Sequence, residues 1–138
     1  MKIDGACHCG RISYEADALP EDAAICHCTD CQTLSGSAFR TIVLTQKGSF
    51  KLRSGEPKIY MKTGESGVKR QQAFCPECGS PIFSTTVDDG PKVHSIRVGT
   101  LRQRDQFAPK AQGWFRSAQK WVGDLASIPK FEKQRPNW

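Results

Sequence analysis

The chain carries at residues 75–79 the stretch Cys75-Pro76-Glu77-Cys78-Gly79, in which two residues separate two cysteines. This spacing lets both thiolates reach one tetrahedral zinc ion. The glycine that follows relaxes the tight turn after the second ligand. The stretch therefore predicts a zinc knuckle and a fold that a metal ion helps to hold together.

A second cysteine pair, Cys7 and Cys9, lies near the start of the chain and is also followed by a glycine, Gly10. In an extended segment residues i and i+2 point to the same side, so both sulfurs could face one ion. We expect this pair to complete the site of Cys75 and Cys78. The spacing also allows a different partition, in which Cys75 and Cys78 share an ion with two cysteines of a third cluster. Cys7 and Cys9 would then be a redox pair or free thiols.

The third cluster is Cys26-His27-Cys28-Thr29-Asp30-Cys31, which packs three thiols into six residues. The three clusters account for all seven cysteines, so one four-thiolate site and one three-thiolate site would use every one. Structural zinc normally has four protein ligands, whereas catalytic zinc keeps three and leaves one position open. The count therefore predicts one zinc that stabilises the fold and a second, on Cys26, Cys28 and Cys31, that takes part in chemistry.

An open zinc with three thiolate ligands suits an incoming thiol, because soft sulfur binds zinc and the binding lowers the pKa of the thiol. This indicates a thiol substrate. The alternative is a second structural zinc whose fourth position is closed by water or by one of three histidines, His8, His27 and His94. His27 stands between two ligands, so we expect its side chain to point away from the ion.

Length and composition indicate one modest domain. The chain has 138 residues, of which 38% are hydrophobic, and we expect a single domain over residues 1–138 with a C-terminal tail at residues 130–138. No apolar run approaches the roughly 20 residues of a membrane span. The start, Met-Lys-Ile-Asp-Gly-Ala-Cys, lacks the apolar core of a signal peptide, so we expect a cytoplasmic protein. Clustered cysteines in that compartment bind metals more often than they form disulfides.

The net charge is basic. Its formal value is +6, which seven thiolates and two zinc ions would reduce to roughly +3. A basic surface attracts polyanions or small acidic ligands. The basic residues are scattered along the chain and no stripe alternates them with aromatic residues, so the pattern argues against nucleic acid binding.

Strand patterns dominate the chain, because apolar and polar residues alternate or β-branched residues follow one another in short runs. The expected strands are residues 11–16, 39–45, 49–53, 59–61, 72–74, 82–87 and 93–98. Asp89-Gly90 is a hairpin turn signal between the last two. Helix is scarce: one or two turns are expected over residues 29–34, which end at Gly36, and a short turn within residues 119–128. We therefore expect a mainly β fold of short antiparallel strands that metal ions hold together.

The motifs taken together resemble the family of glutathione-dependent formaldehyde-activating enzymes, which also includes centromere protein V. The family pattern Gly-x-Cys-x-Cys-Gly is matched at residues 5–10, Cys-His-Cys-x-x-Cys-Gln at residues 26–32, and Phe-Cys-x-x-Cys-Gly-Ser-Pro-Ile at residues 74–82. A later Gly-Thr-Leu element is matched at residues 99–101, and Ser117 and Trp121 fit the last one. The resemblance covers nearly the whole chain.

The resemblance implies a β-tent of coiled antiparallel sheets and two zinc ions. By it, the structural zinc is assigned to Cys7, Cys9, Cys75 and Cys78. The catalytic zinc is assigned to Cys26, Cys28 and Cys31. The implied activity is the making and breaking of a carbon–sulfur bond, as in the joining of glutathione and formaldehyde to S-hydroxymethylglutathione.

Two positions depart from the family pattern. The family often has aspartate after Gly-Thr-Leu, where this chain has Arg102, and often has His-Ile-Trp where this chain reads Gln112-Gly113-Trp114. The cysteines are unaffected. The departures put in doubt any role of these side chains in substrate choice, so the thiol and the aldehyde are expected only to be similar to glutathione and formaldehyde.

Three functions follow from these patterns. The first is a zinc-dependent carbon–sulfur lyase in which a thiol adds to, or releases, a small aldehyde. The second is a zinc module that binds or scavenges thiols without turnover, and the third is a nucleic-acid-associated zinc protein. For a lyase, the basic residues expected as candidates to hold the carboxylates of the ligand are Arg11, Arg40, Lys69, Arg70 and Arg97.

Overall fold

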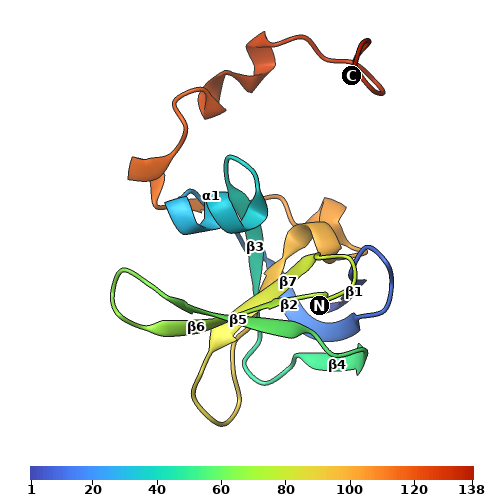
Figure 1. Cartoon of the computed structure of the whole chain (residues 1–138), viewed down its shortest axis with the longest axis vertical. Coiled ribbons are helices and arrows are strands. Elements are labelled where there is room, and N and C mark those ends of the chain that lie inside the picture. The colour runs from blue at the N-terminus through green and yellow to red at the C-terminus, as the bar shows by residue number, and fades with distance from the viewer.

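The computed structural model describes residues 1–138 and shows nine β-strands, one short α-helix and four 3-10 turns (Figure 1). The strands are β1 Lys2–Ala6, β2 Ser13–Cys26, β3 Arg40–Thr45, β4 Lys51–Ser54, β5 Lys58–Thr63, β6 Lys69–Phe74, β7 Pro81–Thr86, β8 Ser95–Arg97 and β9 Ala111–Gly113. The helix is α1 Thr29–Ser35, and the 3-10 turns are η1 Val98–Thr100, η2 Arg104–Gln106, η3 Phe115–Ser117 and η4 Val122–Ser127. The expected mainly β fold with little helix is confirmed. No helix of the chain has both the length and the apolar character that crossing a bilayer requires.

The strands follow the order β1-β2-β3-β8-β7-β6-β5, and every pairing along this path is antiparallel. Strand β2 organises the sheet because it is 14 residues long and its two halves have different partners. Its first half pairs with β1 and β4, and its second half pairs with β3 and, in parallel, with β9. A shift of register between Ala18 and Ala23 separates the two halves, so one strand can serve two differently oriented parts of the sheet.

The core lies where β1, β2, β7 and β8 meet the turn after β8. In the first half of β2 alternate residues are buried, among them Tyr14, as period-2 patterning predicts. Ile82 on β7 and Ile96 on β8 are fully buried with it. The Tyr14 hydroxyl lies 2.7 Å from Oγ1 of Thr100 in η1, so the turn closes over the end of the core.

The chain after β9 leaves the sheet. It contains η3 and η4 and extends away from the strands beyond α1 (Figure 1). Side chains of this segment, such as Trp121 and Phe131, are about half exposed. The expected helical turn within residues 119–128 is present as η4.

Candidate metal centres

Four cysteines come together from two loops far apart in the sequence. Cys7 and Cys9 lie in the turn between β1 and β2, and Cys75 and Cys78 lie in the turn between β6 and β7. All four sulfurs lie within 4.8 Å of one another. Two of the separations, 3.6 Å from Cys7 Sγ to Cys9 Sγ and 3.8 Å from Cys9 Sγ to Cys75 Sγ, match the roughly 3.8 Å edge of a tetrahedron with Zn–S bonds of about 2.3 Å. This group fits one zinc ion.

Local hydrogen bonds favour the thiolate form of Cys78, whereas the pKa of Cys9 is raised to about 11, because the hydrogen bond from the Arg11 backbone is outweighed by desolvation and the three neighbouring thiols. The Ile12 amide donates to Cys7 Sγ over 3.3 Å, and Cys7 and Cys75 are buried. The side chain and the backbone of Ser80 donate to the Cys78 sulfur and lower the pKa of that thiol to about 5. Thiolates are the form in which cysteine binds zinc.

The second group is built at the junction of β2 and α1. Cys26 ends β2, Cys28 is the N-cap residue of α1, and Cys31 lies in its first turn. The three sulfurs lie within 4.8 Å of one another and apart from the four-cysteine group. The Cys31 amide donates to Cys28 Sγ over 3.3 Å, so the sulfur caps the helix. The junction of strand and helix therefore gathers three sulfurs with no fourth cysteine beside them.

The thiols of the second group share their protons unequally. The hydrogen bond from Cys31 lowers the pKa of Cys26 to about 5 despite partial burial, and the same contact raises the pKa of Cys31 above its ordinary value. The positive charge of Lys62 further favours the Cys26 thiolate, and that of Arg40 favours the Cys31 thiolate. The donor set, three thiols in a locally basic environment, suits a soft divalent cation such as zinc.

None of the three histidines belongs to either cysteine group. The ring of His27 is fully buried, lies edge-on to Phe39 and Phe115, and has Nε2 2.8 Å from Oε1 of Gln112. His94 is stacked on Phe50 with ring centroids 4.3 Å apart. His8 is exposed, and its backbone amide donates to Ser80.

A cleft of about 710 Å³ opens beside Cys28. It is walled by α1, β5 with the loop after it, and the segment around η3. Its charged residues are paired across it. Lys62 Nζ lies 3.0 Å from a carboxylate oxygen of Asp30, and the Arg116 guanidinium donates to both oxygens of Glu65 at 3.2 and 3.1 Å. This is the cleft through which a small molecule could reach the three-cysteine group.

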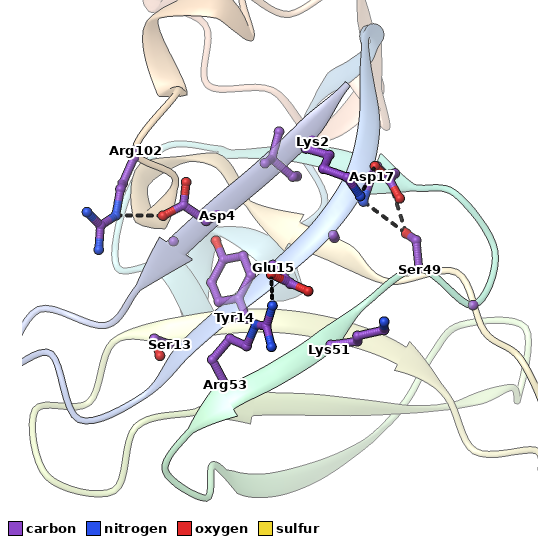
Figure 2. Close-up of a pocket in the computed structure, with 14 residues that line it drawn as sticks. Lys2, Asp4, Ser13, Tyr14, Glu15, Asp17, Ser49, Lys51, Arg53 and Arg102 are labelled. Carbon is purple, nitrogen blue, oxygen red and sulfur yellow. Dashed lines mark hydrogen bonds and ion pairs between the residues drawn. The ribbon is translucent and has the colours of Figure 1, made fainter.

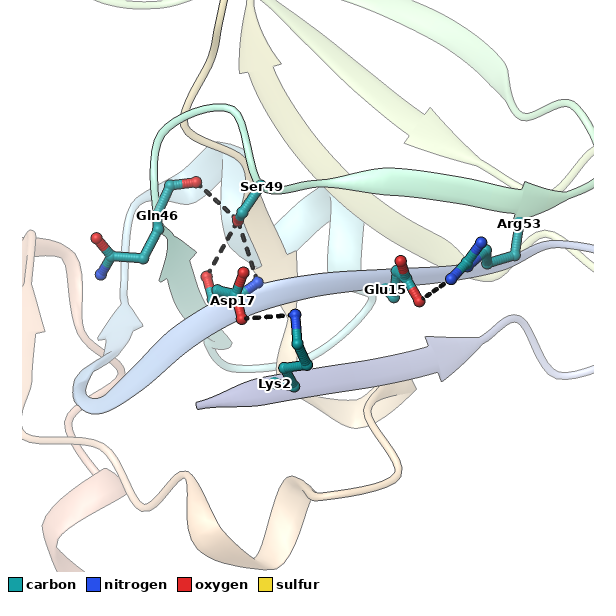
Figure 3. Close-up of polar contacts among 6 residues, drawn as sticks. All are labelled: Lys2, Glu15, Asp17, Gln46, Ser49 and Arg53. Atoms are coloured by element: carbon teal, nitrogen blue, oxygen red, sulfur yellow. Dashed lines mark hydrogen bonds and ion pairs between the residues drawn. The ribbon is translucent and has the colours of Figure 1, made fainter.

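A second cleft, of about 620 Å³, lies on the far part of the sheet and contains no cysteine (Figure 2). Most of its charges are already paired: Arg102 with Asp4 at 2.7 Å, Lys2 with Asp17 at 3.6 Å, and Arg53 with Glu15. Figure 3 shows two of these pairs along β2, together with Ser49, whose hydroxyl donates to the backbone carbonyl oxygens of Asp17 and Gln46. This cleft borders neither cysteine group, so it is a weaker candidate than the cleft at Cys28.

The two departures from the expected family pattern fall in different places. Arg102 lies in the charge-paired cleft, where it binds Asp4. Gln112 lies on β9 and contacts His27, which stands between Cys26 and Cys28. Of the two, only Gln112 touches the loop that holds the three-cysteine group.

The basic residues predicted to hold a ligand separate into two sets. Arg40 and Arg97 are buried, and their charges act on the thiols of the three-cysteine group. Arg11 and Lys69 are exposed, and Arg70 donates to the Ser84 hydroxyl. The sequence pattern did not single out Gln72, Tyr60 or Lys62, because an isolated polar residue on a strand carries no signal of what it faces.

Comparisons with known proteins bear on the family and the fold of the chain. Residues 2–117 match the model of a family described as "Glutathione-dependent formaldehyde-activating enzyme". A crystal structure of a Rhodobacter sphaeroides protein superposes with a TM-score of 0.59 at 19% identity, over 79% of this chain and 98% of that one. The structural likeness supports the fold. The family match spans all seven cysteines.

Proposed function

Because the chain belongs to the family of glutathione-dependent formaldehyde-activating enzymes, we propose that it is a zinc-dependent carbon–sulfur lyase. Its substrates would be a glutathione-like thiol and a small, formaldehyde-like aldehyde. The observation that carries the proposal is the group of Cys26, Cys28 and Cys31. Its sulfurs lie within 4.8 Å of one another, no fourth cysteine or histidine joins them, and Cys28 borders a cleft of about 710 Å³.

We assign two zinc ions to the chain. The four-cysteine group, with its near-tetrahedral sulfur separations, would hold a closed structural ion. The three-cysteine group would hold the second. A zinc ion there supplies an open coordination position and a positive charge that lowers the pKa of an incoming thiol.

The residues around the second group have separate tasks. Cys26, Cys28 and Cys31 would hold the ion at the end of β2, and the capping contact of Cys28 fixes the orientation of the loop. Gln32 extends the support, because its amide donates to the carbonyls of His27 and Ser117 at 2.9 and 3.0 Å. The site is thereby tied to the segment that forms the opposite wall of the cleft.

The reaction forms one carbon–sulfur bond. The thiol loses its proton, and its sulfur attacks the carbonyl carbon of the aldehyde. The carbonyl oxygen then takes up a proton to give a hemithioacetal, which with formaldehyde is an S-hydroxymethyl thiol adduct. The reverse direction breaks the same bond and releases the aldehyde. Lys62, which lines the cleft beside Asp30, contributes a positive charge that favours thiolate at the entrance.

The test is the substitution Cys28→Ser in the zinc-loaded protein. A hydroxyl replaces one soft ligand, so we expect zinc content to fall from two ions to one per chain. The enzyme-dependent rate of adduct formation, measured by exchange NMR with glutathione and formaldehyde, should fall at least about 100-fold. The control Thr33→Ser alters an exposed residue of the same helix and should leave both values unchanged.

The same assay separates catalysis from thiol binding without turnover. Glutathione and formaldehyde also combine spontaneously, so the rate with catalytic amounts of protein is compared with the rate without it. Acceleration that Cys28→Ser removes supports the lyase. An adduct that forms at the spontaneous rate, with one thiol bound per zinc-loaded chain, would instead favour a scavenging module.

A further inference from the structure

Two arginines are buried side by side in the sheet next to the three-cysteine group. Arg40 on β3 and Arg97 on β8 are only 5% and 8% exposed. Ile42 of β3 faces Arg97 in the register, and Arg40 lies two residues before Ile42. The two arginines therefore extend from the same face as diagonal neighbours. Both guanidinium groups donate to Oε1 of Gln72, at 3.5 Å from Arg40 and 2.6 Å from Arg97.

Neither guanidinium has a carboxylate partner. The ion pairs of the chain involve other residues, and the remaining hydrogen bonds of Arg97 go to the carbonyl and hydroxyl oxygens of Ser95. Its Nε has no partner at all. Burial, and then the adjacent charge of Arg40, lower the pKa of Arg97 to about 9. Two like charges buried side by side without a carboxylate partner are costly to keep in a fold.

Both arginine residues border open space. A cavity of about 320 Å³ is lined by both arginines together with Leu34, Tyr60 and Phe74. A second cavity, of about 280 Å³, also includes both. A mostly apolar pocket with a few converging polar groups is the usual form of a small-molecule site. The Arg97 Nε without a partner and the cavity that both arginines line are independent observations that indicate an anionic ligand.

The arginine pocket adjoins the cleft at Cys28 along two elements. On α1, Asp30 lines the cleft and Leu34, one turn later on the same face, lines the pocket. On β5, Lys62 lines the cleft and Tyr60, on the same face of the strand, lines the pocket. The ion pair of Asp30 and Lys62 lies at this junction. A ligand that spans the α1–β5 junction would reach both the arginine pocket and the cleft at Cys28.

We propose that Arg40 and Arg97 form a carboxylate-binding site that holds a carboxylate of the thiol substrate while its sulfur lies at Cys26, Cys28 and Cys31. This rests on the proposed function, because the cysteine group sets where the sulfur goes. The planar guanidinium fork binds carboxylates with paired, charge-assisted hydrogen bonds. An alternative role, neutralising the thiolates alone, explains neither the pocket nor the absence of any hydrogen bond from these guanidinium groups to a cysteine sulfur.

The experiment measures binding without chemistry. S-methylglutathione has no free thiol, so its affinity reports the carboxylate site and not thiolate binding or turnover. It is compared, by titration calorimetry on the zinc-loaded protein, with its diamide, in which both carboxylates are amides. We expect the acid to bind at least tenfold more tightly than the diamide, and Arg97→Gln to reduce this ratio below about twofold. Arg97→Lys, which keeps the charge but loses the fork, should give an intermediate ratio.

The control is Arg135→Gln, which removes the same charge from an exposed tail residue and should leave the ratio unchanged. Folding of each variant is checked by zinc content and thermal unfolding. Equal binding of acid and diamide by the wild type, or an undiminished ratio in folded Arg97→Gln, would overturn the proposal. Because S-methylglutathione has no free thiol, this binding measurement does not depend on the result of the lyase assay. The lyase assay likewise does not depend on the result of the binding measurement.

Discussion

His94 shows how a residue's surroundings, rather than its type, set its role. It is partly buried between aromatic rings, stacked on Phe50 and edge-on to Phe83 at a centroid distance of 4.8 Å. Its Nδ1 is buried without a partner. Burial, reinforced by the charges of Lys92 and Arg70, lowers the pKa of this imidazole to about 4. A histidine in such a setting stays neutral and acts as an aromatic core residue.

This setting predicts a pH dependence of stability. Above pH 6.5 His94 is neutral in both the folded and the unfolded chain and has no effect. As pH falls from 6.5 to about 4 the unfolded chain binds the proton first, so stability is lost over this window. Because His94 is only partly buried, solvent screens part of this effect. We expect the free energy of unfolding to fall by about 1–2 kcal/mol.

The measurement is the urea midpoint at pH 7.0, 5.5 and 4.5 for the wild type and His94→Phe. The variant keeps the ring stack but cannot bind a proton, so its stability should fall less over the same range. Acid release of zinc affects both proteins alike and cancels in the difference. Parallel curves for the two proteins would contradict the assigned pKa shift.

The residue scale also shows where prediction from sequence ended. The grouping of the seven cysteines into candidate ligand clusters was predictable, because ligand spacing is local, and so was the position of His27 outside the ligand group. The contact between His27 and Gln112, 85 residues apart, was not. It depends on the parallel pairing of β2 with β9, which no local pattern indicates.

At the scale of elements, β1 depends on a glycine. Gly5 is opposite Tyr14 in the β1–β2 register and forms a bridge with Leu101. A Cβ at this position would overlap the ring and hydroxyl of Tyr14 and the Thr100 carbonyl oxygen. The small residue lets Tyr14 and η1 close over the strand.

We therefore expect Gly5→Ala to destabilise the chain by about 2–3 kcal/mol, because Tyr14 and η1 must move apart. Gly123→Ala is the matched control, since nothing lies within 4 Å of its Cβ position. Urea unfolding of both variants checks this. A Gly5→Ala protein as stable as the control would show that β1 is not closely packed against Tyr14.

Most strands were predictable, and two were missed. Each of the seven expected strands overlaps an observed one, and α1 spans the expected turn after Cys28. Strand β1 was missed because its Lys2–Ala6 segment ends in small residues with weak strand preference. Strand β9 was missed because it has only three residues, all of them exposed. It is a strand only because it pairs with β2, which lies far away in the sequence.

At the scale of the whole molecule, the four-cysteine group closes the sheet on itself. The β1–β2 turn lies at one end of the strand order, and the β6–β7 turn lies near the other, with β3 and β8 between them. Cys9 and Cys75 are 66 residues apart yet their sulfurs are 3.8 Å apart. One ion at this point would join both ends of the sheet.

Loss of this ion should therefore destabilise the fold strongly, whereas loss of the other should have little effect on stability. We expect Cys75→Ser to lower the melting temperature by at least about 10 °C, because zinc-binding free energy contributes to folding. Cys28→Ser, at the edge of the fold, should change it by no more than about 3 °C. Differential scanning calorimetry with zinc analysis checks both, and equal shifts in the two variants would contradict the division into structural and catalytic ions.

The sequence by itself determined the cysteine clusters, the short strands, the helical turn at the third cluster and the family, because these are carried by spacing and alternation within a few residues. Only the tertiary structure decided that Arg40 and Arg97 line one pocket without a carboxylate partner, and that Arg102 lies away from the cysteines while Gln112 contacts their loop. These depend on pairings between strands far apart in the chain. Local patterns specify what each strand can bury, and the packed sheet specifies what each side chain faces.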